Sequence, residues 1–144
     1  MNNYNFMNDI WYQNMKNNSM RNNNTNSSLY NPTVGYNNGN LFANLYSQYK
    51  NYRPIELTSK NEQEKLLLTI SSLSFAAHDL NLYLDLHPND QTMLALFNDY
   101  RKEVNRLTSM YEEKYGPLTI TSNSLENSPF SWVKDKWPWR DNYV

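Results

Sequence analysis

The side chains best suited to chemistry in this sequence are its two histidines and the acids around them. His78 and His87 stand nine residues apart, with Asp79, Asp85 and Asp90 nearby. A metal site on a helical scaffold would need a carboxylate three residues before a histidine, so that both ligands share one helix face. Neither histidine has such a partner. We therefore interpret both as structural residues and expect no metal ligands and no cofactor.

Other catalytic constellations are missing from the sequence. The chain has no cysteine and only three glycines among 144 residues. Without cysteine no thiolate nucleophile, thiolate metal ligand or disulfide is available, and no strained turn holds a serine next to a histidine and an acid. Three glycines are too few for a phosphate-binding loop. We predict that the protein is not an enzyme.

Nucleic acid and membrane are also disfavoured as partners. The best basic and aromatic cluster is Lys50 and Arg53 with Tyr46, Tyr49 and Tyr52, but the net charge of the chain is −1. A charge near zero provides no field to attract phosphate groups. No apolar run approaches the roughly 20 residues of a membrane span. The N-terminus lacks the basic and apolar regions of a secretory signal, so we expect none.

Two apolar repeats with helical spacing must position these residues. Their members recur three or four residues apart, first before Pro88 and again after it: Leu66, Ile70, Leu73, Ala77, Leu80 and Leu84, then Met93, Phe97, Tyr100, Val104, Leu107 and Tyr111. This spacing places each set on one face of a helix, and two such faces pack against each other. We predict a mainly α protein with a small antiparallel helical hairpin over residues 59–116.

Capping signals predict the ends of the first helix. Thr58 or Ser59 can accept hydrogen bonds from the N–H groups of the first turn, and the helix should end near Leu86.

Pro88 organises the connection between the helices. It fixes its own φ, moves His87 out of the α region and suits the first turn of a second helix, in which Asp90 would also lie. The second helix should run from Pro88 to about Lys114, with Gly116 just beyond its end. Its charged residues should form a solvated outer face: Asp99, Arg101, Lys102, Glu103, Arg106, Glu112 and Glu113.

A second apolar row widens the apolar face of the first helix. Leu68, Phe75 and Leu82 recur every seven residues on an adjoining face. One partner helix cannot cover both rows. The sequence leaves four candidates for covering this row: the 41–58 segment, the C-terminal tail, a second copy of the chain or a different protein.

The segments outside the hairpin differ in composition. Residues 1–40 contain fifteen asparagines, and such a composition predicts a disordered arm, which is either a self-associating segment or a linker. Residues 41–58 predict a short docking helix, capped by Asn40, and a linker; the helix either covers the hairpin as a third layer or folds on contact with a partner. Residues 117–144 predict an irregular tail rich in Trp and Pro. Its indoles either fold back onto the hairpin or anchor in a partner.

One set of motifs resembles a known family. The run from Leu80 to Asp90, the Tyr-Gly-Pro-Leu that begins at Tyr115 and the terminal Trp-Pro-Trp look like the spore coat protein CotJB family, over residues from about 61 to 139. The motif positions, taken as the candidate protein-interaction residues, are Leu80, Tyr83, Leu84, Asp85, His87, Pro88, Asp90, Tyr115, Gly116, Pro117, Trp132, Trp137, Pro138 and Trp139.

The resemblance implies a setting and partners. CotJB family proteins belong to the inner layers of the bacterial endospore coat, are made in the mother cell and assemble with CotJA and with CotJC, which resembles a manganese catalase. On this account the chain is a structural or assembly component, and any metal belongs to its partner. The alternatives are a self-associating cytoplasmic adaptor unrelated to spores and a regulatory subunit of the catalase-like enzyme.

Overall fold

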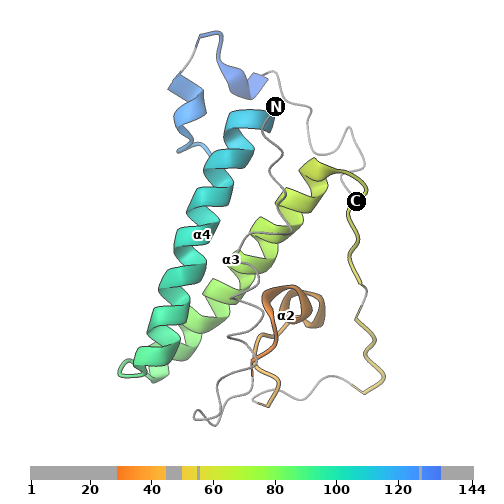
Figure 1. The fold of residues 1–144 in the computed structure, drawn as a ribbon, viewed down its shortest axis with the longest axis vertical. Coiled ribbons are helices and arrows are strands. Elements are labelled where there is room, and N and C mark those ends of the chain that lie inside the picture. Colours follow the sequence, from red (N-terminus) through yellow and green to blue (C-terminus); the bar gives the residue numbers. More distant parts are fainter. Residues whose placement is uncertain (1–28, 45–49, 55, 127, 134–144) are drawn as a thin grey trace. The chain divides into compact units, whose positions relative to one another are not determined.

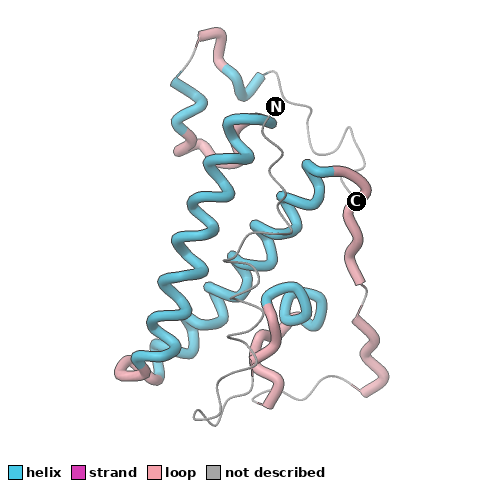
Figure 2. The backbone as a smooth tube through the Cα atoms, in the orientation of Figure 1, coloured by secondary structure: helices cyan, strands magenta, loops and turns pink. Residues whose placement is uncertain are grey.

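The structure, a computed structural model, describes residues 29–44, 50–54, 56–126 and 128–133. The chain divides into two units, Met1–Ile55 and Glu56–Val144, and each is described by itself. The described residues form helices α2, α3 and α4, two short 3-10 helices and one isolated β-bridge (Figures 1 and 2). The prediction of a mainly α protein with a helical hairpin is confirmed.

Helix α3 (Glu62–Leu86) begins at an asparagine N-cap that is paired with a glutamate three residues later. Asn61 is the N-cap, and its Oδ1 accepts a hydrogen bond of 2.8 Å from the Glu64 N–H, while Glu64 Oε1 accepts from Asn61 Nδ2 at 2.9 Å. Thr58 and Ser59 were expected to cap this helix, but asparagine is an equally good cap and has its glutamate three residues later. The predicted end at Leu86 is confirmed.

Helix α4 (Gln91–Tyr115) begins three residues later than predicted. Pro88 and Asn89 form the turn, and Asp90 is the N-cap with an extended backbone at φ −76° and ψ 92°. The prediction that Pro88 opens the helix is therefore wrong. An aspartate that accepts two N–H groups stabilises a helix start more than a proline at the first position does.

The two long helices pack against each other as an antiparallel pair. Most of the predicted rows are buried, with Leu66, Ile70, Leu73 and Leu80 on α3 and Met93, Tyr100, Leu107 and Tyr111 on α4. Each fully buried leucine contributes about 1.5–3 kcal/mol. Ala76 is buried in place of Ala77, and Leu84, Phe97 and Val104 are half-buried.

The ribbons of α3 and α4 lie close together at the turn and farther apart at the other end of the hairpin (Figure 1). Long side chains join the two helices at that end. Gln63 Nε2 donates to the Tyr111 hydroxyl at 3.0 Å, and Lys114 Nζ donates to Glu62 Oε2 at 2.7 Å. These bonds join the first turn of α3 to the last turns of α4.

The other unit contains helix α2 (Pro32–Asn38), inside the segment that was predicted to be disordered. Asn31 caps it by accepting from Val34 N–H at 2.9 Å, and Gly39 ends it in the left-handed region at φ 72°. A bridge between Leu29 and Phe42 closes the loop around the helix. The disorder prediction is therefore wrong for residues 29–40, because asparagines cap this short helix. Residues 1–28 lie outside the described part.

The short helix predicted from residue 41 is not found where the chain is described. Residues 41–44 form a bend, the bridge and a turn, in which the Asn40 amide holds Phe42 through bonds of 2.8 and 3.0 Å. Residues 45–49 lie outside the described part.

The described part of the tail contains two single-turn 3-10 helices, η1 (Asn123–Glu126) and η2 (Ser131–Val133). In the ranges that the structure describes, no helix is both long and apolar enough to cross a membrane.

Candidate interaction site at the hairpin turn

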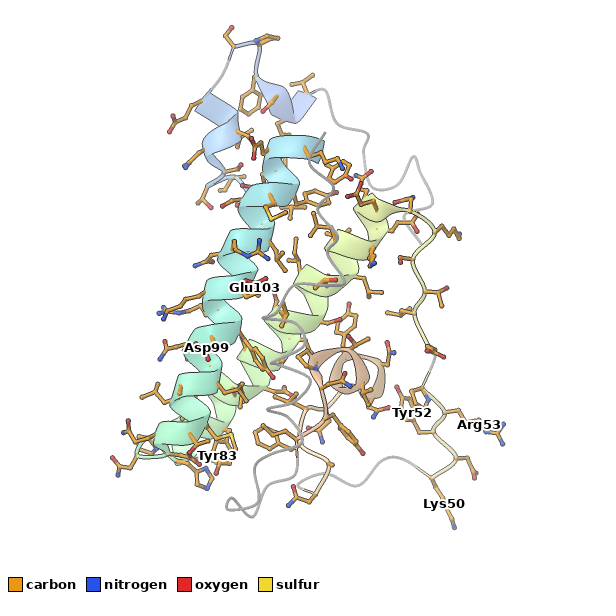
Figure 3. The ribbon with its side chains drawn as sticks, viewed as in Figure 1. Lys50, Tyr52, Arg53, Tyr83, Asp99 and Glu103 are labelled. Atoms are coloured by element: carbon orange, nitrogen blue, oxygen red, sulfur yellow. The ribbon has the colours of Figure 1, made fainter. Side chains whose placement is uncertain are left out.

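Three of the motif residues meet at the turn. The Tyr83 ring stacks on the His87 ring with 4.1 Å between centroids and 10° between planes, and the Tyr83 hydroxyl donates to Asp90 Oδ2 at 3.3 Å. The Tyr83 carbonyl accepts from the His87 N–H at 3.1 Å and lies 3.0 Å from His87 Nδ1. A carbonyl oxygen only accepts, so Nδ1 carries the hydrogen in this arrangement. We call Tyr83, His87 and Asp90 the turn clasp (Figure 3 labels Tyr83).

Asp90 uses both of its carboxylate oxygens in this clasp. While Oδ2 accepts from Tyr83, Oδ1 accepts from the N–H groups of Thr92 at 3.1 Å and Met93 at 3.0 Å. These are two of the N–H groups that a helix start leaves without a partner. One side chain therefore caps α4 and joins it to α3.

The other motif residues near the turn differ in burial. Leu80 is fully buried and Leu84 half-buried, whereas Asp85 and Pro88 are exposed. The leucines serve the core, and Pro88 stiffens the turn by fixing its own φ.

The second group of motif residues lies at the far end of α4. Gly116, at φ 115°, donates its N–H to the Glu112 carbonyl at 3.2 Å, and the Glu112 carboxylate accepts from Leu118 N–H at 3.0 Å. The Tyr115 ring is tilted against Tyr111 at 5.1 Å between centroids. Pro117 follows, half-buried. A helix of 25 residues is about 37 Å long at ~1.5 Å per residue, so the motif marks the two ends of the hairpin.

The aromatic tail is described only in part. Trp132 lies in η2 and is 36 % exposed. Trp137, Pro138 and Trp139 lie outside the described residues. The choice between packing on the hairpin and anchoring in a partner stays a prediction.

One charged pair on α4 was not foreseen. Glu103 was expected on a solvated face, but the structure buries it (Figure 3 labels Glu103). Arg106 donates two hydrogen bonds to the Glu103 carboxylate, from Nε to Oε2 at 2.8 Å and from Nη2 to Oε1 at 2.5 Å. The geometry is the bidentate arrangement that makes arginine–carboxylate pairs strong. The spacing of three residues between the two charges was the available signal.

The pKa values of Tyr100 and Lys114 are shifted. Burial raises the pKa of Tyr100 far above its ordinary value, and the charge of the neighbouring Asp99 adds to the effect. The hydrogen bond to Glu62 raises the pKa of the exposed Lys114. Both shifts favour the forms present at neutral pH, a neutral phenol and a charged ammonium.

The hydrogen bonds and ring contacts of the turn clasp and of the far end of α4 are contacts within the hairpin. Within the part of the chain that is described, no three His, Asp or Glu side chains come together as metal ligands. Lys50, Tyr52 and Arg53, considered above for nucleic acid, are exposed (Figure 3), and Tyr46 and Tyr49 lie outside the described ranges.

The fold and the turn clasp define a small helical hairpin protein whose motif residues hold a turn and a helix end in place. A family model described as CotJB protein matches residues 64–140, which is more than half of the 144 residues. The chain therefore belongs to the CotJB family, a family of spore coat-related proteins. No curated protein and no solved structure matches the chain.

Proposed function

We propose that this chain is a non-enzymatic structural and assembly component of the inner layers of the bacterial endospore coat, made in the mother cell. The observation that carries the proposal is the family match, which spans α4, nearly all of α3 and the Trp-Pro-Trp tail. The turn clasp supports it, because the polar groups most suited to chemistry serve the fold: Asp90 joins α4 to α3, and His87 packs on the last turn of α3.

The proposed partners are CotJA and the manganese-catalase-like CotJC. In this account the metal chemistry belongs to the catalase-like partner, and this chain supplies contact surface. Large apolar side chains on the tail support that role, since Phe130 is 54 % exposed and Trp132 36 % exposed. Exposed aromatic side chains of this kind are enriched in protein interfaces.

Co-purification tests the proposal. Tagged chain is co-expressed with the catalase-like coat protein, and elution is compared with that of the Trp132→Ala, Trp137→Ala, Trp139→Ala triple variant. The proposal predicts that the wild-type pair elutes together and that the triple variant elutes apart from its partner. Separate elution of the wild-type pair would contradict the direct partnership.

A further inference from the structure

Helix α3 carries a second apolar surface next to the turn. Leu82 is 52 % exposed and Leu86 80 % exposed. They are four residues apart and therefore share one face. At about 100° per residue, Leu82 lies roughly 160° around the helix from the buried Leu80. The two leucines therefore face away from the core of the hairpin.

These leucines stand on a turn of α3 that is tied to α4. Tyr83 follows Leu82 in the sequence and His87 follows Leu86, and the rings of Tyr83 and His87 stack on each other. The hydrogen bond from Tyr83 to Asp90 connects this last turn of α3 to α4. A side chain on an ordered support loses less conformational freedom on binding than one on a free loop. The pair is therefore suited to act as an anchor.

The charge around the leucines is negative. Asp85 is exposed and flanks the pair, and residues 66–86 of α3 contain two aspartates, one histidine and no lysine or arginine. A partner surface that receives these leucines would be complementary if basic side chains border its apolar pocket.

We propose that Leu82 and Leu86, with Asp85 beside them, form the anchor that this chain inserts into a basic-rimmed apolar pocket on a partner coat protein. The inference rests on the proposed function. A second copy of the chain fits the surface less well, because a two-fold axis would bring the two Asp85 carboxylates together. Two leucines also fall far short of the ~800 Å² that each partner buries in a stable interface, so they are the centre of a larger contact.

The test measures binding of the purified full chain to the purified catalase-like coat protein by biolayer interferometry. Leu82→Ser combined with Leu86→Ser should weaken binding about tenfold or more, which is the loss expected of an anchor. Asp85→Lys should also weaken it, and the loss should shrink as salt screens the charge. Ile120→Ser is the matched control, because Ile120 is 83 % exposed and belongs to the opposite end of the hairpin.

Each outcome decides the proposal. If the leucine double variant binds like the wild type, the anchor is wrong and the partnership stands. If the leucine double variant weakens binding but Asp85→Lys does not, the basic rim of the partner pocket is wrong. If the wild-type chain does not bind, both the partnership and the anchor fall. Light scattering on the isolated chain tests a second copy as the occupant: a wild-type dimer that the leucine variant converts to a monomer would show that a second copy covers the face and would overturn the proposal. Unchanged circular dichroism confirms that the variants are folded.

Discussion

Removing the Asp90 side chain should destabilise the hairpin, because Asp90 both caps α4 and accepts a hydrogen bond from Tyr83 on α3. Asp90→Ala deletes the N-cap of α4, which costs about 1 kcal/mol, and the long hydrogen bond from Tyr83, which adds about 0.5 kcal/mol at the weak end of the usual range. The total of about 1.5 kcal/mol corresponds to a melting temperature lower by roughly 6–12 °C for a domain of this size.

The measurement is urea unfolding followed by circular dichroism. Asp90→Asn is the matched control, since its amide oxygen still caps the helix. It loses the interaction of the charge with the helix dipole and the hydrogen bond that Asp90 Oδ2 accepts from Tyr83, together about 1 kcal/mol. The reasoning is refuted if Asp90→Ala unfolds within about 0.5 kcal/mol of the wild type. It is also refuted if the asparagine variant loses as much stability as the alanine variant.

Three further predictions concern the interior of the hairpin. Leu80→Ala should lower the free energy of unfolding by about 2–5 kcal/mol, because Leu80 is fully buried, and a loss below about 1 kcal/mol in urea unfolding would contradict its place in the core. Arg106→Ala should cost about 1–3 kcal/mol by leaving Glu103 without its partner, and adding Glu103→Gln should restore part of that loss; no recovery in the double variant would show that the pair is not the cause. Because the folded state raises the pKa of Tyr100, the neutral phenol stabilises the fold fully below the ordinary tyrosine pKa of about 10, and stability should fall as pH rises above it. Tyr100→Phe should lose less stability than the wild type between neutral and strongly alkaline pH in unfolding titrations, and equal losses in the two proteins would contradict the argument.

The apolar rows of the hairpin could be predicted because burial against one partner imposes a period near 3.6. Leu66, Ile70, Leu73 and Leu80 follow from that period alone, and the structure buries all four. The start of α4 could not be fixed in the same way. Pro88 and Asp90 are both good start signals, and only the geometry of the turn decides which of them the helix uses.

Asparagine was the main source of error in the N-terminal segment. Counted as composition, it indicates disorder, yet Asn31 caps α2 and the Asn40 side chain pairs with the backbone of Phe42. These roles depend on single hydrogen bonds that composition does not report. Glu103 was missed for a similar reason, because residue type alone does not tell a solvated glutamate from one that a neighbouring arginine has paired and the fold has buried.

The central claim is that this chain is a component of the spore coat that other coat proteins hold in place. Coat extracts from purified spores, probed with an antibody against the chain, test it most directly, in wild-type cells and in cells that lack the catalase-like protein. The account predicts that the chain is present in the wild-type coat extract, and that without its partner it is still made in the mother cell but is absent from the coat. Recovery of the chain from the spore core or from vegetative cells, and not from the coat, would contradict the account.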